Sequence, residues 1–174
     1  MNKSIGFLGI LLLTYCCSVK SEKTEYESII EEWIGKKIVL PRLSNQFNYD
    51  EKVKVVTKIN GNCFKCISRL ELWSRFIDEI EKNCESCNVQ YYFYISGADT
   101  SAFKTMNDSI IQFNYPVIFD QNNTFYKLNK LHENSLYHTM LLDSLDKVLL
   151  IGTPILNKKL QALYIDEIVR IDSK

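Results

Sequence analysis

Apolar and polar positions follow two patterns that alternate along the chain, one typical of strands and one typical of helices. Short runs rich in β-branched and aromatic residues, bounded by turn-forming residues, predict strands. The predicted strands cover Lys36–Leu40, Val53–Ile59, Val89–Ile95, Pro116–Phe119, Thr139–Leu142 and Val148–Ile151. The last two flank a turn at Ser144-Leu145-Asp146, so we expect them to form an antiparallel hairpin.

Apolar residues at spacings of three and four predict helices between these strands. The clearest helix has no glycine or proline and carries an apolar stripe of Ile67, Leu70, Trp73, Phe76, Ile77 and Ile80. We expect it to run without interruption from about Phe64 to Lys82. Further helices are expected over Tyr26–Trp33, Asp99–Phe113, Asn123–Leu131 and Asn157–Ile168. Strands that alternate with helices predict an α/β fold with a central mixed sheet flanked by helices on both faces.

The composition is that of a single globular domain. The chain has 174 residues, of which 46% are hydrophobic and 24% are charged, and this suits one domain with a sizeable core. Lysine and arginine together number 21, as do aspartate and glutamate. Since the sequence has no basic stripe, no nucleic-acid partner is expected.

The first residues resemble an export signal rather than a part of the fold. Lys3 precedes an apolar run, Ile5–Leu13, and two cysteines, Cys16 and Cys17, follow closely. The run is far shorter than the roughly 20 residues that span a bilayer, and it has the length of a signal-peptide core. An apolar run that stops at a cysteine before a polar tether resembles a bacterial lipoprotein signal, in which that cysteine is lipidated. An ordinary cleaved secretory signal is the alternative.

Cysteine parity favours Cys17 over Cys16 as the lipidated residue. Loss of Cys16 with the signal leaves two close pairs in the mature chain, Cys63/Cys66 and Cys84/Cys87. Lipidation at Cys16 leaves Cys17 unpaired, which is unfavourable in an oxidising compartment. We therefore expect a signal peptide over residues 1–17, a tether with a short helix over 18–35, and one domain over 36–174. The domain is expected on the periplasmic side of the bacterial envelope, held to a membrane by a lipid anchor.

The Cys63-Phe64-Lys65-Cys66 segment is the candidate reactive site. It follows a β-branched strand and a turn, Asn60-Gly61-Asn62, and it precedes the clearest helix. A thiol at a helix N-terminus has a lowered pKa because backbone N–H groups and the helix dipole stabilise the thiolate. Cys66, one turn further on, is placed to attack a mixed disulfide at Cys63, and the charge of Lys65 favours the thiolate. This arrangement is typical of a redox-active dithiol.

Four segments of the chain share the pattern of a known family: Val53–Cys66, Tyr91–Ser96, Tyr115–Asp120 and Thr139–Asp143 with Lys147-Val148. They resemble the TlpA-type thioredoxin-like proteins, which are membrane-tethered thiol–disulfide oxidoreductases of the bacterial envelope. The resemblance implies a thioredoxin-like fold with an inserted strand–helix unit before the last hairpin. It also implies that Cys63 is the nucleophile and Cys66 the resolving cysteine. The implied partners are protein thiols and disulfides or a membrane redox partner, and no dissociable cofactor is implied.

The chain departs from this family's pattern at two places. The family has tryptophan before the first cysteine and proline before the second, where this chain has Asn62 and Lys65. It also has a cis-proline before the strand that faces the dithiol, where this chain has Tyr137 or His138. A non-proline cis peptide costs about 2.5–4 kcal/mol, so a trans bond is expected. A second function therefore stays open, a non-catalytic binding or assembly module of the envelope whose disulfides are structural.

The second pair, Cys84 and Cys87, has three interpretations. Together with Cys63 and Cys66 its spacing fits a four-cysteine zinc site, but the ends of one continuous helix over 67–83 lie about 25 Å apart. A second redox pair is disfavoured because a helix C-terminus destabilises a thiolate. We favour a structural disulfide between Cys84 and Cys87, and we expect no metal site.

His138 is expected near the dithiol. A base, a metal ligand and a packing residue are its candidate roles, and we favour packing.

Overall fold

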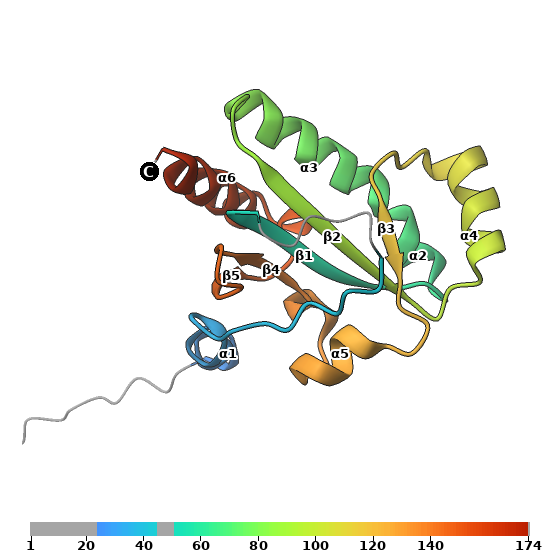
Figure 1. The fold of residues 1–174 in the computed structure, drawn as a ribbon, viewed down its shortest axis with the longest axis horizontal. Helices are drawn as coiled ribbons and strands as arrows, with labels where there is room; N and C mark the ends of the chain where they lie inside the picture. The colour runs from blue at the N-terminus through green and yellow to red at the C-terminus, as the bar shows by residue number, and fades with distance from the viewer. Residues whose placement is uncertain (1–23, 45–50, 174) are drawn as a thin grey trace, which may run out of the picture.

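The computed structural model describes residues 24–44 and 51–173. The expected signal peptide, with Cys16 and Cys17, lies outside the described residues. A five-stranded sheet in the order β3-β2-β1-β4-β5 forms the centre of the fold (Figure 1). Its strands are β1 (Val53–Asn60), β2 (Val89–Ser96), β3 (Val117–Phe119), β4 (Thr139–Leu142) and β5 (Val148–Ile151). The first three are parallel, and β4 runs antiparallel to both β1 and β5, so the sheet is mixed as predicted.

Helices cover both faces of this sheet (Figure 1). They are α1 (Glu25–Trp33), α2 (Phe64–Ser68), α3 (Leu70–Asn83), α4 (Thr100–Met106), α5 (Thr124–Asn129) and α6 (Lys158–Asp172). One apolar core joins the sheet to α2, α3, α4 and α6, and a second core on the other face joins it to α1 and α5. Within the described ranges, none of the helices has the length and apolarity needed to cross a membrane.

Strand β2 is buried on both faces, which explains its continuous apolar sequence. Along β2, Tyr91, Phe93 and Ile95 enter the core beneath α3, whereas Tyr92 and Tyr94 enter the core beneath α1 and α5. A parallel strand covered on both faces has no solvent-facing side, so its sequence does not alternate between apolar and polar residues.

The helix expected to run from Phe64 to Lys82 is interrupted, so that prediction is wrong. α2 ends at Ser68, and Arg69, with φ −69° and ψ −8°, leads into α3 at Leu70. The Ser68 hydroxyl donates to the Lys65 carbonyl at 3.2 Å, so a side chain competes with the backbone for a helical carbonyl. The change of direction occurs without a glycine or proline, which is why the sequence pattern does not reveal it.

The strand expected over Lys36–Leu40 is instead an extended segment with one isolated bridge, between Lys37 and Lys147. The side-chain amide of Asn129 then replaces a neighbouring strand. It donates to the Val39 carbonyl at 2.9 Å and accepts from the Val39 N–H at 2.8 Å. The Asn129 side chain, on α5, thus takes the hydrogen bonds of the Val39 N–H and carbonyl. The strand pairing beside β5 therefore does not extend beyond Lys37.

The helix expected over Asp99–Phe113 also changes character before its end. α4 stops at Met106, and Asn107–Ile111 form a π-helical turn. The Asn107 side chain accepts from the Phe113 N–H at 3.0 Å and donates to the Phe113 carbonyl at 3.1 Å. These bonds end the helix and turn Phe113 into the core.

Candidate functional site

A tight turn fixes the position of Cys63 at the end of the central strand. Gly61 donates its N–H to the Ser96 carbonyl, where β2 ends, at 2.7 Å. A Cβ added at Gly61 would lie 2.4 Å from the Cβ of Ala98, so only glycine permits this close approach of two backbones. The turn therefore holds Cys63 against the ends of both β1 and β2.

Cys63 and Cys66 form a disulfide across the first turn of α2, with their Cα atoms 5.2 Å apart. Cys63 is the N-cap residue of α2, and the Cys66 N–H donates to the Cys63 Sγ at 3.2 Å. A hydrogen bond to the charged form of a group favours that form, so this contact favours a thiolate on Cys63 in the reduced protein. Both cysteines are half-buried, and Lys65 between them is exposed.

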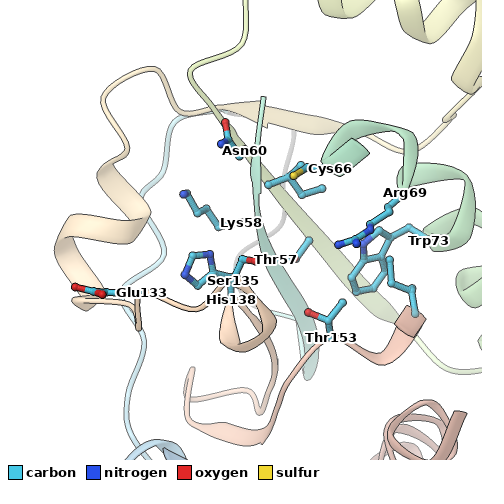
Figure 2. Close-up of a pocket in the computed structure, with 12 residues that line it drawn as sticks. Thr57, Lys58, Asn60, Cys66, Arg69, Trp73, Glu133, Ser135, His138 and Thr153 are labelled. Carbon is cyan, nitrogen blue, oxygen red and sulfur yellow. The ribbon is translucent and has the colours of Figure 1, made fainter. Parts of the chain in front are cut away.

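An open cavity of about 260 Å³ borders this disulfide on the side of Cys66. Figure 2 shows Cys66, Arg69 and Trp73 on one side of β1, with Lys58, His138 and Glu133 on the other. The remaining lining residues are Thr57, Ile59, Asn60, Ser135, Thr153 and Ile155. The cavity is thus a mixed surface that has a sulfur, cationic groups and hydroxyls within one opening.

The structure brings His138 to this cavity, as a buried residue immediately before β4. Its Nε2 lies 2.6 Å from the His132 carbonyl, and its ring meets the Tyr126 ring edge-on. Burial lowers the pKa of His138, the His132 carbonyl opposes this, and the charge of Lys58 lowers the pKa further. His138 therefore packs as a neutral imidazole, with Nε2–H as the donor to the carbonyl.

Lys58 is a residue of the site that the sequence pattern did not single out. Its N–H donates to the His138 carbonyl at 3.1 Å, and its ammonium lies 5.2 Å from the centre of the Tyr126 ring. Burial lowers the pKa of Lys58, and the Asp120 carboxylate partly opposes this. The available signal was a second lysine, after Lys54, on the same face of a β-branched strand.

Hydroxyl groups connect the strands beside the cavity. The hydroxyls of Thr57 and Thr139, which pair across β1 and β4, lie 2.8 Å apart, and that of Thr139 is 3.5 Å from the Thr153 hydroxyl. Thr153 in turn donates to the Leu136 carbonyl at 3.1 Å. This polar chain satisfies groups that the core would otherwise leave unpaired, and only the register of the sheet reveals it.

The second disulfide, between Cys84 and Cys87, lies at the opposite end of the helical pair. Cys84 is the C-cap residue of α3, and the two Cα atoms are 5.3 Å apart. Each pair is closed on itself, and the 14-residue α3 lies between them (Figure 1). The break at Arg69 does not bring the pairs together, so the four cysteines do not share one metal.

The chain has the thioredoxin fold, a mixed sheet flanked by helices with a Cys-x-x-Cys segment after the first long strand. The segment β3–α5 is the strand–helix unit expected before the last hairpin. No protein-family model and no curated protein matches the sequence. Solved structures of similar fold supply the comparison.

Three solved structures illustrate this likeness. A domain of a possible thiol-disulfide isomerase from Cytophaga hutchinsonii has a TM-score of 0.56 at 13% identity, and the match covers 79% of this chain and 95% of that one. The peroxidoxin BcpB from Mycobacterium tuberculosis has a TM-score of 0.51 at 13% identity, covering 79% and 96%. An uncharacterized thioredoxin-like protein from Porphyromonas gingivalis has a TM-score of 0.51 at 15% identity, covering 74% and 81%. At these identities the likeness establishes the fold.

Proposed function

We propose that the protein is a thiol–disulfide oxidoreductase whose reactive pair is Cys63 and Cys66. The observation that carries this proposal is the Cys66 N–H that donates to the Cys63 Sγ at 3.2 Å, beside an open cavity. Such a donor stabilises the thiolate, which is the attacking species in disulfide exchange. The similar structure from Cytophaga hutchinsonii is described as a possible thiol-disulfide isomerase, which also supports an exchange activity for this chain.

The proposed reaction transfers two electrons and needs no cofactor. The Cys63 thiolate attacks one sulfur of a substrate disulfide, and the substrate's other sulfur leaves as a thiolate. Cys66, deprotonated, then attacks the Cys63 sulfur, which closes the Cys63–Cys66 disulfide and releases the second substrate thiolate. The substrate is reduced and the protein oxidised, and the reverse sequence oxidises a substrate dithiol.

We further propose that the protein acts in the bacterial envelope, tethered to a membrane through a lipid on Cys17. Its substrates are protein thiols and disulfides or a membrane redox partner. The apolar run before Cys16 and Cys17 and the polar segment after them support this location. Replacement of Cys17 by serine should release the full-length protein from the membrane fraction or leave it unprocessed. A soluble wild-type product without lipid, cut at another site, would contradict the anchor.

Trapping of a mixed disulfide tests the reaction. With a reduced protein and a substrate disulfide, Cys66→Ser should accumulate a covalent complex through Cys63, because the resolving thiol is missing. Cys63→Ser should accumulate none, and the Cys84→Ser/Cys87→Ser double variant should turn over like the wild type. Equal trapping by Cys63→Ser and Cys66→Ser would contradict the assigned roles.

The alternative is a binding or assembly module that keeps the Cys63–Cys66 disulfide as a structural bond. The presence of Tyr137 and His138, rather than proline, before β4 favours this alternative. The reduction potential of the pair separates the two functions, because structural disulfides lie below about −300 mV and exchange-active pairs lie higher. Titration in the Cys84→Ser/Cys87→Ser background measures that potential for Cys63 and Cys66 alone.

A further inference from the structure

The loop between α3 and β2 meets the end of α6 at a small cluster of metal-binding groups. The Sγ atoms of Cys84 and Cys87 and a carboxylate oxygen of Asp172 all lie within 4.8 Å of one another, and all three residues are half-buried. Asp172 is far from both cysteines in the sequence, so only the fold brings it to them. We propose that reduction of the Cys84–Cys87 disulfide by a dithiol, which is itself oxidised to a disulfide, creates a site for a thiophilic divalent cation, first of all Zn²⁺, with Asp172 as the third ligand.

The positions of the donor atoms fit a tetrahedral zinc centre. Zn–S bonds of about 2.3 Å and Zn–O bonds of about 2.0 Å place donor atoms roughly 3.5–3.8 Å apart in a tetrahedron. The Cys84 Sγ already lies 3.9 Å from the Asp172 Oδ2. Cys-x-x-Cys is a common zinc-ligand spacing. Once the disulfide is reduced, the two sulfurs have to separate, and the Cys87 Sγ, which lies within 4.8 Å of the Asp172 carboxylate, has to reach about 3.5 Å from it. The fourth position is left to water or another ligand.

The surrounding contacts hold Asp172 in place. Ser86 donates its hydroxyl to the Asp172 Oδ2 at 3.1 Å, which orients the carboxylate in the manner of an outer-shell partner. Tyr164 and Ile168 of the same helix are buried in the core with α3. Ile171, in the last turn of α6, packs against the same core, so the backbone that bears Asp172 is held beside the loop before β2.

Charge explains why the reduced cluster favours a cation. Two thiolates beside a carboxylate place three negative charges at close range, and a divalent cation offsets two of them. Binding of the cation displaces the two thiol protons to solvent and forms two metal–sulfur bonds, with no change in oxidation state. In the disulfide the sulfurs have no proton or charge to offer, so the oxidised form does not bind the cation. The oxidation state of Cys84 and Cys87 thus determines whether the two residues form a disulfide or bind a metal ion.

The test uses the full-length chain in detergent with Cys16, Cys17, Cys63 and Cys66 replaced by serine, so that only Cys84 and Cys87 remain. After reduction and removal of the reductant, Zn²⁺ affinity is measured by competition with a chromophoric chelator, and Co²⁺ spectra report tetrahedral thiolate ligation. The reduced protein should bind one Zn²⁺ and its oxidised form none. Asp172→Asn, which keeps an acceptor for Ser86, should weaken binding at least about tenfold.

Glu85→Gln is the matched control, because Glu85 lies between the two cysteines in sequence but outside the cluster. It should leave the affinity unchanged, and a further Cys84→Ser change should abolish binding. Circular dichroism verifies that each variant is folded. Equal affinity in Asp172→Asn and its parent, or no Zn²⁺ binding by the folded, reduced parent, would overturn the proposal. These outcomes do not depend on the reaction proposed for Cys63 and Cys66.

Discussion

Lys54 and Asp146 form an ion pair in which the ammonium is buried and the carboxylate reaches the surface. The Lys54 Nζ lies 2.8 Å from the Asp146 Oδ1, with side-chain exposures of 1% and 28%. The same ammonium donates to the Ser144 carbonyl at 3.3 Å. Lys54 therefore connects β1 to the turn between β4 and β5.

Asp146→Asn should destabilise the protein by about 2–4 kcal/mol, because it leaves a buried charge without its counter-ion. This loss of stability is smaller than for a fully buried ion pair, because the Asp146 carboxylate is partly solvated. Asp146 has φ of +63°, and asparagine tolerates this conformation, so the change isolates the charge. Urea unfolding measures the loss, and Asp143→Asn, in the same turn, addresses turn hydrogen bonds rather than the ion pair. Lys54→Met should cost much less than Asp146→Asn, and the reverse order would contradict this account.

The stability of the protein should fall as the pH is lowered below about 7, through the titration of His138. Burial lowers the pKa of His138 in the folded protein below its usual 6.5. As the pH falls, the unfolded chain therefore binds the proton before the folded protein does, and this stabilises the unfolded state. The slope is at most about 1.4 kcal/mol per pH unit for one proton. His138→Gln should flatten the profile, whereas His132→Gln should retain it. An unchanged slope in His138→Gln would show that other groups cause the dependence.

Asn129→Ala should free the segment around Val39, because it removes both hydrogen bonds to the Val39 backbone and one to the Phe125 carbonyl. Val39 is exposed and its bonds to Asn129 are part-buried, so this loss should cost about 1–2 kcal/mol, less than for fully buried backbone groups. Hydrogen exchange should accelerate in residues 37–44 before it changes in β1 or β2. Asn122→Ala, at an exposed position before α5, should leave exchange unaltered. Uniform acceleration over the whole domain would instead indicate a global effect.

Alkylation of the reduced protein should label Cys63 before Cys66, because only Cys63 accepts the N–H bond that stabilises a thiolate. Lys65→Glu should slow labelling at neutral pH about two- to fivefold, the size expected for an exposed charge. Lys82→Glu, at the far end of α3, is the control and should have no effect. Equal labelling rates for both cysteines would leave the structural role as the better account.

The arrangement of elements was predictable because each main strand and helix has its own pattern. β2 is apolar on both faces, and the stripe from Leu70 to Ile80 marks the face of α3 that is buried. These local signals give element order and sheet type. They do not reveal the break at Arg69, where a serine hydroxyl and tertiary packing decide, or the loss of a strand after Lys37, where a side chain from α5 takes over.

The site was predictable only where chemistry and sequence spacing coincide. Cys63 and Cys66 are recognisable from their spacing and their place after β1. Lys58 and the Thr57–Thr139 pair depend on the register between β1 and β4, which joins residues more than 80 positions apart. No local pattern specifies that register, so the cavity beside Cys66 could not be derived from the sequence.

The separation of the two disulfides by α3 limits how the molecule can carry electrons. A helix of 14 residues is about 21 Å long, whereas disulfide exchange requires one sulfur to touch another. When both cysteine pairs are reduced, each dithiol holds two electrons, and the two dithiols cannot transfer electrons to each other within one molecule. Each pair must be reduced and oxidised by a partner, or by a second copy of the chain, at its own end of α3. The two pairs will therefore equilibrate with a common reductant at independent rates.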